Sequence, residues 1–305
     1  MIFNNIIGND AVKNDLKKAI EHNLISHSYI FQGTEGIGKI LFAKDFAKSI
    51  LCENKTGEDN CKSCIMFDSN NHPDFILLNE NEEAIKIDEI REFIKKVIEK
   101  PIISKNKVCI INAADKMTKD AQNCLLKTLE EPPEYMTIIL ISSNENLLLT
   151  TIKSRCTKIQ FNRLSNEEIR EYIKKDTNIN LDEFNFNTIK YLNGSIKKIN
   201  DILNNKDTYL NIERFLKGTK EKSKLEFYLD GKIIYDKDKI YDFLEFMISV
   251  LYDLGLKDSD FLNGIQIVQN TINKLKSNNN FDMSIDNMLF KIWEGVNENN
   301  NWRKI

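Results

Sequence analysis

A glycine-rich loop near the N-terminus constrains the fold of this chain more than any other feature. The loop has the pattern G-x-x-x-x-G-K, follows the apolar run 28–32 and opens the helical pattern 39–52. A loop of this kind, placed between a strand and a helix, points backbone N–H groups at phosphate oxygens while its lysine neutralises their charge. We therefore predict a phosphate-binding loop (P-loop), with a chance glycine turn as the alternative. Its candidate nucleotide-binding residues are Gly33, Thr34, Glu35, Gly36, Ile37, Gly38, Lys39 and Ile40.

Short apolar runs alternate with helical patterns through the first half of the chain. The runs are rich in Ile, Leu, Val and Phe, as buried strands are, and they occupy 28–32, 75–78, 108–112, 137–142 and 158–161. The helical patterns between them occupy 39–52, 88–100 and 119–130. Strands that alternate with helices predict an α/β fold with a five-stranded parallel sheet covered on both faces.

The second half of the sequence predicts helices only. A capping-box pattern, Ser165 followed by Glu168, begins this part, and the polar stretch 204–208 is a plausible boundary within it. Apolar residues at helical spacing then continue toward the C-terminus. Because 305 residues exceed the usual size of one core, we expect three domains: 1–164, a small helical domain 165–207, and an all-α domain 208–305.

Composition excludes several classes of protein. Hydrophobic residues make up 41% and charged residues 29% of the chain, and no apolar run approaches the roughly 20 residues that span a bilayer. The first residues carry neither a basic segment nor a cleavage-site pattern, so we expect a cytoplasmic protein without a membrane partner. The formal net charge of −3 argues against nucleic-acid binding by the whole surface and leaves room only for a local basic patch.

The P-loop lacks parts that ATP hydrolysis requires. Ile40 stands where such loops carry a Ser or Thr whose hydroxyl binds Mg²⁺. The strand 108–112 ends on Asn112 and Ala113, where acidic residues would hold the metal and orient water. Asp115 follows; it either replaces a lost carboxylate or, as we favour, caps the next helix. We therefore predict weak binding of ATP or ADP without hydrolysis.

Three of the six cysteines form a cluster in the sequence. Cys52, Cys61 and Cys64 follow the P-loop helix with the spacing C-x8-C-x2-C. Structural zinc sites take four tetrahedral ligands, so a fourth side chain is needed, and Asp68 or His72 can supply it. The alternative is a degenerate site without metal. The remaining cysteines, Cys109, Cys124 and Cys156, are interpreted as packing residues.

Four motifs together resemble one family. They are Ile6-Ile7-Gly8, the stretch 26–31 before the loop, the KTLEEPP sequence at 127–133, and Ser154-Arg155-Cys156. The combination resembles bacterial clamp-loader subunits of the AAA+ family, and within it the delta-prime branch. The resemblance is specific over about the first 165 residues and weak beyond them. It implies an AAA+ P-loop domain, a helical lid domain and a C-terminal helical collar domain that assembles a ring.

The resemblance also implies roles for individual residues. Arg155 would enter the ATP site of a neighbouring subunit as an arginine finger; the alternative is a surface arginine that caps a helix or pairs with an acid. Asn144 would be the first nucleotide sensor, or simply a turn residue. Lys197 or Lys198 would be the second sensor, unless both are solvated lysines. The family's fourth cysteine falls on Phe67.

The implied function is that of a stator within the DNA polymerase III holoenzyme. Its partners would be the gamma/tau and delta subunits, and the assembly would place the sliding clamp on primed DNA. The loss of magnesium-binding side chains at Ile40, Asn112 and Ala113 fits this role. Two alternatives stay open: an ATP-hydrolysing gamma/tau-like motor of the same loader, and an unrelated P-loop NTPase.

Overall fold

The computed structural model describes residues 3–176 and 191–297, which fall into two compact units. Among these residues, the first unit comprises those up to 176 together with Gly194–Lys197. The second comprises 191–193 and the residues from Lys198 onward. The predicted domain boundaries after residues 164 and 207 stay predictions. Across the two described stretches, no helix has both the length and the apolar character that crossing a membrane demands.

The first unit is built on a five-stranded sheet. Its strand order is β2-β3-β4-β1-β5, and every neighbouring pair is parallel. The strands are β1 Ser28–Gln32, β2 Phe75–Leu78, β3 Lys107–Ile111, β4 Met136–Ser142 and β5 Thr157–Gln160. All five predicted strands are confirmed; β3 and β5 each begin and end one residue earlier than predicted, and β4 begins one residue earlier. Because the strands are parallel, the segments that leave β1, β3 and β4 emerge at the same edge of the sheet.

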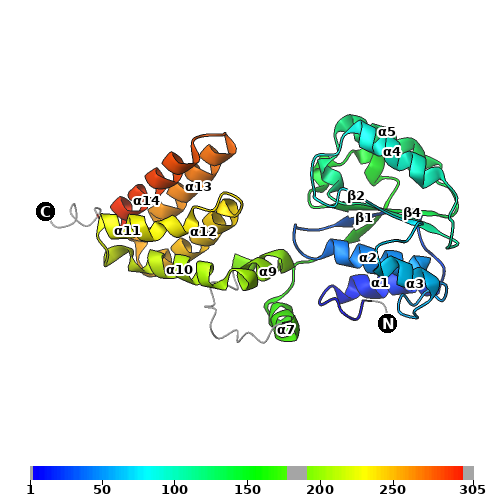
Figure 1. Cartoon of the computed structure of the whole chain (residues 1–305), viewed down its shortest axis with the longest axis horizontal. Helices are drawn as coiled ribbons and strands as arrows, with labels where there is room; N and C mark the ends of the chain where they lie inside the picture. The colour runs from blue at the N-terminus through cyan, green and yellow to red at the C-terminus, as the bar shows by residue number, and fades with distance from the viewer. Residues whose placement is uncertain (1–2, 177–190, 298–305) are drawn as a thin grey trace. The chain divides into compact units, whose positions relative to one another are not determined.

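Helices cover both faces of this sheet (Figure 1). Helices α1, α2 and α3 lie on one face, and α4 and α5 lie on the other. The helices of this unit are α1 Asp10–Glu21, α2 Lys39–Leu51, α3 Lys62–Asp68, α4 Ile87–Ile98, α5 Lys119–Glu130, α6 Thr150–Lys153 and α7 Asn166–Asp176, with short 3-10 turns η1 Ala114–Lys116 and η2 Glu145–Leu147. The three predicted helices are therefore present.

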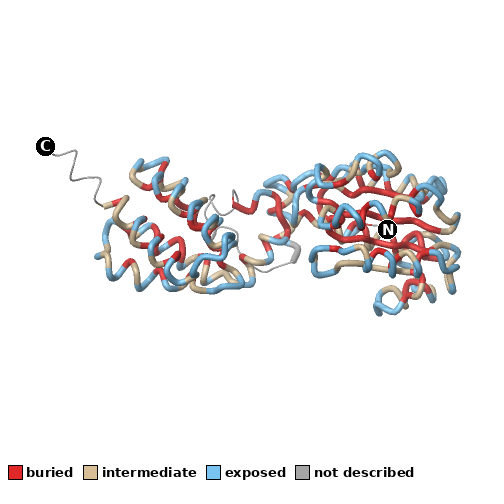
Figure 2. The backbone as a smooth tube through the Cα atoms, turned by 90° about the horizontal axis from the view of Figure 1, so that it is seen from above, coloured by how far each residue is buried: buried red, intermediate tan, exposed pale blue. Residues whose placement is uncertain are grey.

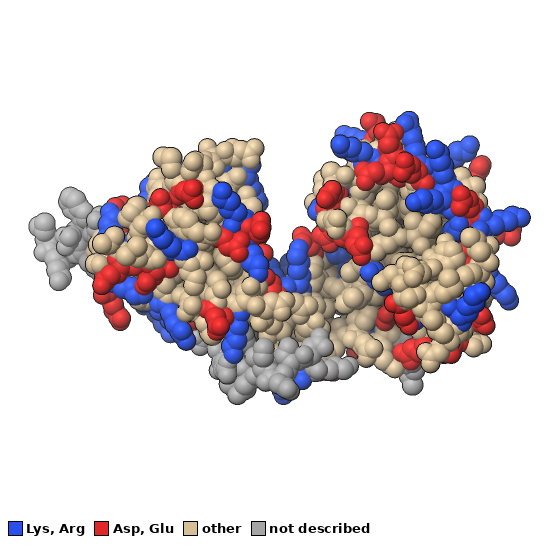
Figure 3. Space-filling model, viewed as in Figure 1, with Lys and Arg blue, Asp and Glu red and all other residues tan. Residues whose placement is uncertain are grey.

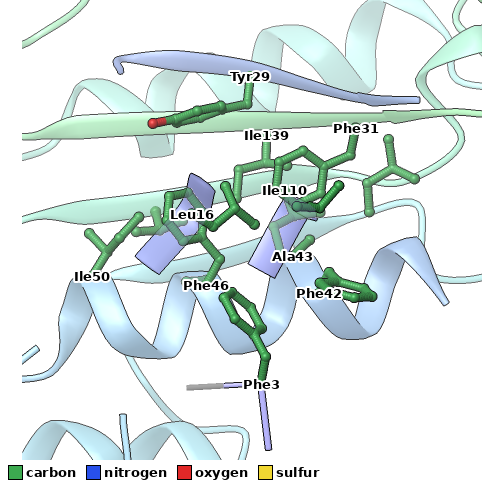
Figure 4. Packing of buried hydrophobic residues seen from close by; sticks show 14 of the residues in the cluster. Phe3, Leu16, Tyr29, Phe31, Phe42, Ala43, Phe46, Ile50, Ile110 and Ile139 are labelled. Atoms are coloured by element: carbon green, nitrogen blue, oxygen red, sulfur yellow. The ribbon is translucent and has the colours of Figure 1, made fainter. Parts of the chain in front are cut away.

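The alternation of side chains along β1 produces two separate hydrophobic clusters. Tyr29 and Phe31 point toward α1 and α2, where they pack with Phe42 and Phe46 (Figure 4). Ile30, between them, belongs to the cluster on the face of α4 and α5. Successive residues of a strand point to opposite faces, so a strand buried on both sides must be apolar throughout. This is why the sequence shows uninterrupted apolar runs.

The second unit contains only helices in its described residues. Helix α9, Ile196–Asn204, leads into it. The others are α10 Lys206–Lys217, α11 Lys224–Gly231, α12 Ile240–Lys257, α13 Leu262–Lys276 and α14 Phe281–Asn297, with 3-10 turns η4 Gly218–Lys220, η5 Lys232–Ile234 and η6 Ser259–Phe261. Apolar residues at helical spacing on α12 and α14 are buried. Figure 2 marks the buried residues of both units in red. The predicted α/β fold with a helical C-terminal part is confirmed.

Candidate functional site

The glycine-rich loop lies at the edge of the sheet where β1 ends and α2 begins. The backbone N–H of Gly33 donates to the carbonyl of Ser142 at the end of β4 (3.3 Å), which ties the loop to the neighbouring strand. Gly36 and Gly38 have φ of 78° and 88°, in the left-handed region that residues with a Cβ adopt at a cost. The loop therefore has the strand-to-helix position that its sequence predicts.

Lys39 folds back into the loop. Its Nζ donates to the carbonyls of Gly33 (2.7 Å) and Thr34 (2.8 Å) and to Oγ of Ser143 (3.2 Å). Burial lowers the pKa of the Lys39 ammonium to about 8, although the negative charges of Asp115, Glu82 and Glu35 oppose the shift. A phosphate group must therefore compete with two loop carbonyls for this amine.

The oxygens that would hold magnesium are missing on both sides of the loop. Ile40 packs against the apolar cluster under α1 and α2. At the end of β3, Asn112 is buried, and its carbonyl accepts a hydrogen bond from Nδ2 of Asn79 (3.1 Å). Ala113 follows in the left-handed region with φ of 48°. These two positions therefore offer no carboxylate to a metal ion, and a replacement by Asp115 stays the alternative.

Asp115 does not cap a helix, and that expectation was wrong. The N-cap of α5 is Thr118, whose side chain accepts from the backbone N–H of Ala121. Asp115 instead accepts, through Oδ1, the backbone N–H of Ser143 at the end of β4 (3.2 Å). The carboxylate thus bridges the segments that follow β3 and β4, and its charge acts on Lys39. Ser143 went unnoticed in the sequence, where a serine after a strand carries no signal.

The segment Gly194–Lys197 packs on the P-loop. The backbone N–H of Lys197 donates to the carbonyl of Gly36 (3.1 Å), and its Nζ pairs with Glu35 Oε1 (2.8 Å). The hydrogen bond from Lys197 lowers the pKa of Glu35, against the effect of burial. A Cβ on Gly36 would come within 2.2 Å of Ser195 Oγ. Of the two predicted second sensors, Lys197 therefore reaches the loop.

The other two sensor candidates have different surroundings. Lys198 belongs to the second unit, where its Nζ pairs with Glu245 (2.8 Å) and lies 4.4 Å from the centre of the Tyr191 ring. Asn144 is exposed at the start of η2, and its Oδ1 accepts the backbone N–H of Asn146 (3.1 Å). This is the geometry of a turn residue. A sensor role for Asn144 stays a prediction.

Arg155 lies in the turn between α6 and β5. Its backbone carbonyl accepts from Ser28 Oγ (2.7 Å), which fixes the turn to the start of β1. Its guanidinium pairs with Glu130 Oε1 (2.6 Å) and donates to the carbonyl of Thr151 (2.9 Å). Both charged side chains are partly exposed, 33% for Arg155 and 49% for Glu130. These contacts are those of the alternative, an arginine that pairs with an acid and bonds to a helix carbonyl, and Glu130 lies within the KTLEEPP sequence. The arginine-finger role stays a prediction.

The three clustered cysteines meet a carboxylate that sequence spacing did not select. Cys52, Cys61, Cys64 and Asp59 place their ligand atoms within 4.8 Å of one another, so this cluster can hold a metal ion. Asp68 pairs instead with Lys48 (2.7 Å), and His72 shares a hydrogen bond with Ser63 Oγ (2.8 Å). Neither predicted fourth ligand belongs to the cluster. The interpretation considered only residues after Cys64, whereas Asp59 precedes Cys61.

The remaining cysteines behave as packing residues. Cys109 is fully buried within β3, and burial raises the pKa of its thiol to about 12. Cys124 and Cys156 are half-buried and pack against the cluster on the α4 and α5 face. Burial also raises the pKa of Cys156. A thiol with a raised pKa is a poor nucleophile, which fits a packing role.

Comparison with known proteins adds sequence relatives of two kinds. A protein family described as "DNA polymerase III, delta subunit" matches residues 8–165 of this chain. The chain is 36% identical over 158 residues to DNA polymerase III subunit delta' of Bacillus subtilis, across 51% of this chain and 48% of that protein. It is 31% identical over 208 residues to DNA polymerase III subunit gamma of Buchnera aphidicola, across 66% of this chain and 57% of that protein. The matches thus span about half the length of these curated relatives.

A solved structure resembles most of the chain. It is a DNA polymerase III gamma subunit-related protein from Thermotoga maritima, 17% identical, with a TM-score of 0.51. The superposition covers 92% of this chain and 99% of that one. At this level of identity the likeness supports the fold alone.

Proposed function

The chain belongs to the family described as DNA polymerase III, delta subunit, and from this premise we propose that it is a clamp-loader subunit of the delta-prime type. In this role it is a stator that assembles with gamma/tau and delta subunits, and the assembly loads the sliding clamp onto primed DNA. A part in replication places the protein in the cytoplasm. One observation carries the choice of a stator: the P-loop keeps its glycines and Lys39 but has Ile40 where magnesium needs an oxygen.

The main rival is a gamma/tau-like motor of the same loader. Relatives of both the delta' and the gamma type match this chain, so similarity alone does not decide between them. The local chemistry supports the stator, because a motor needs a complete magnesium site. Ile40 contributes no oxygen, and Asn112 and Ala113 contribute no carboxylate. A stator needs none of these groups.

The site also supports a contribution in trans. Arg155 lies in a turn anchored to β1 by the hydrogen bond from Ser28, so its backbone position is defined by the sheet. Its guanidinium is partly exposed and pairs with Glu130, which is also partly exposed. Exposed ion pairs contribute about 0–1 kcal/mol. A triphosphate on a neighbouring subunit carries more negative charge than one carboxylate. Arg155 can therefore leave Glu130 for such a triphosphate at a small cost in free energy.

The purified chain is expected to show no ATP turnover above background in the presence of Mg²⁺. The physical reason is the missing metal ligands at Ile40 and at the end of β3. The measurement is phosphate release at steady state, with a purified gamma/tau subunit as the positive control. Rapid ATP hydrolysis by the isolated chain would favour the motor role and contradict the stator role.

Nucleotide binding, where it occurs, is expected to weaken as pH rises. Phosphate favours the protonated form of Lys39, whose pKa in the free chain is about 8. The fraction of free chains ready to bind therefore falls above that pH, by about tenfold between pH 7 and pH 9. Titration with ADP at both pH values tests this. Lys39→Met should bind more weakly at pH 7 and show no such fall; an equal fall in Lys39→Met would assign the effect to another group.

An unrelated P-loop NTPase is the remaining alternative. That reading predicts no stable complex with gamma/tau and delta subunits. Mixing the three purified proteins and measuring the mass of the product by size-exclusion chromatography with light scattering separates the two cases. We expect a single complex that contains this chain.

A further inference from the structure

The loop between α2 and α3 carries a group of side chains that the proposed function does not use. Cys52 lies at the C-terminal end of α2, Cys61 is the N-cap of α3, and Cys64 lies in the first turn of α3. Asp59 comes from the connecting loop. Cys52 and Cys64 are buried, 4% and 2% exposed, whereas Cys61 and Asp59 are half-buried. The chain thus gathers three soft ligands and one carboxylate in one partly enclosed place.

From this arrangement we propose that Asp59 is the fourth ligand of a zinc site with Cys52, Cys61 and Cys64. The four ligand atoms lie within 4.8 Å of one another. Asp59 Oδ1 is 3.2 Å from Cys52 Sγ and 3.4 Å from Cys64 Sγ. Tetrahedral zinc, with Zn–S of about 2.3 Å and Zn–O of about 2.0 Å, places a sulfur and an oxygen ligand about 3.5 Å apart. The two separations of Asp59 Oδ1 from Cys52 and Cys64 are therefore close to those of a coordinated pair, and the whole set needs only a small contraction to surround one ion.

The two side chains first considered for the fourth position lie outside this cluster and have other partners. Asp68 is bound to Lys48 through both of its carboxylate oxygens, at 2.7 Å and 2.9 Å. His72 is buried, with Nε2 at 2.8 Å from Ser63 Oγ and Nδ1 accepting the backbone N–H of Asp74 (3.1 Å). Both ring nitrogens of His72 are thus occupied. Asp59, by contrast, makes its hydrogen bonds to the three cysteines and to Asn54.

A metal at this place would join two helices across their connecting loop. Binding requires three thiols to lose their protons and form Zn–S bonds, while the carboxylate of Asp59 binds in its ionised form. The loop from Cys52 to Cys61 would then be closed by the metal as well as by the chain. Closing a loop removes conformational freedom from the unfolded chain, so the metal should stabilise the C-terminal end of α2, the helix that begins at the P-loop.

Metal content of the purified full chain tests the assignment. The chain, kept reduced, is loaded with zinc, dialysed against a competing chelator, and analysed for zinc by mass spectrometry. We expect one zinc per chain, and a loss of affinity of at least about tenfold in Asp59→Ala, since even changes outside the ligand set weaken metal sites by about 10- to 100-fold. Asp68→Ala is the matched control and should retain zinc like the unchanged chain. Asp59→Cys should restore binding.

Cobalt substitution supplies a second readout. Cobalt bound by thiolates absorbs through sulfur-to-metal charge transfer, so the band intensity should rise by about a third from the unchanged chain to Asp59→Cys, as three thiolates become four. Zinc retention in Asp59→Ala together with loss in Asp68→Ala or His72→Ala would overturn the assignment of Asp59. A reduced chain that retains no zinc, or a cluster found as a disulfide under reducing conditions, would overturn the site itself. Circular dichroism establishes that each variant is folded.

Discussion

Replacing Arg155 with alanine is expected to lower the clamp-stimulated ATPase rate of a reconstituted loader by about 10- to 100-fold while the complex stays assembled. A guanidinium that enters a neighbouring site stabilises charge on the transferred phosphoryl group, and in GTPases it contributes about 10³- to 10⁵-fold to the rate. The expected loss is smaller because other sites of the loader would keep their own arginines. The measurement is phosphate release with clamp and primed DNA present.

Two further variants separate a chemical role of Arg155 from a structural one. Arg155→Lys keeps the charge but loses the planar fork that binds two oxygens at once, so we expect most of the loss to persist. Glu130→Gln removes the partner that Arg155 has in the isolated chain. Because an exposed pair is worth about 0–1 kcal/mol, its loss should change the rate by no more than about fivefold. Unchanged turnover in Arg155→Ala, with the complex intact, would end the proposed trans role.

Phe42→Ala is expected to destabilise the first unit by about 3–5 kcal/mol. Phe42 is fully buried on α2, close to Phe3 (Figure 4). The centre of its ring lies 5.5 Å from that of Phe3 and 5.0 Å from that of Phe161. Truncation removes apolar contact and leaves a cavity where α2 packs on β1. Since native domains are stable by only about 5–15 kcal/mol, this is a large share of the total.

The adjacent residue on the same helix gives a matched control for Phe42. Leu41 is 48% exposed, so Leu41→Ala should change the free energy of unfolding by no more than about 0.5 kcal/mol. Urea denaturation followed by far-UV circular dichroism measures both. Tryptophan fluorescence reports separately on the C-terminal part of the chain, because both tryptophans, Trp293 and Trp302, lie there. Equal midpoints for Phe42→Ala and the unchanged chain would contradict the packing argument.

The surface charge agrees with a protein that binds nucleic acid only locally, if at all. On the face shown in Figure 3, acidic and basic side chains lie interspersed over both units. A net charge of −3 leads to the same expectation. In the proposed function, contact with DNA belongs to the assembled loader, so a strongly basic surface is not required of this subunit.

Much of the fold could be predicted because it depends on local patterns. Buried parallel strands need apolar residues on both faces, and this requirement leaves visible runs such as 75–78. Helix α5 has the predicted bounds Lys119–Glu130 because a cap at Thr118 and apolar spacing mark it. The positions of Gly36 and Gly38 reflect a backbone that only glycine adopts easily. Each of these signals lies within a few residues of the feature that it predicts.

The site was less predictable because its contacts join distant parts of the chain. Asp115 was expected to cap a helix and instead bonds to Ser143. Lys197 and Lys198 are adjacent in sequence, yet one pairs with Glu35 and the other with Glu245. The fourth neighbour of the three thiols is Asp59, which no spacing rule selected. Distance along a chain does not measure distance across a loop, so spacing could not rank these candidates.

The sequence by itself determined that the chain has a G-x-x-x-x-G-K loop with Ile40 at the position where such loops carry a Ser or Thr, and an arginine in a Ser-Arg-Cys motif. These features depend on the identity of single residues, so they can be recognised without the tertiary structure. Only the tertiary structure decided what those residues touch: Lys39 with loop carbonyls, Arg155 with Glu130, and the cysteines with Asp59. The physical reason is that hydrogen bonds, ion pairs and metal coordination act over a few ångströms, and folding alone sets which side chains come that close.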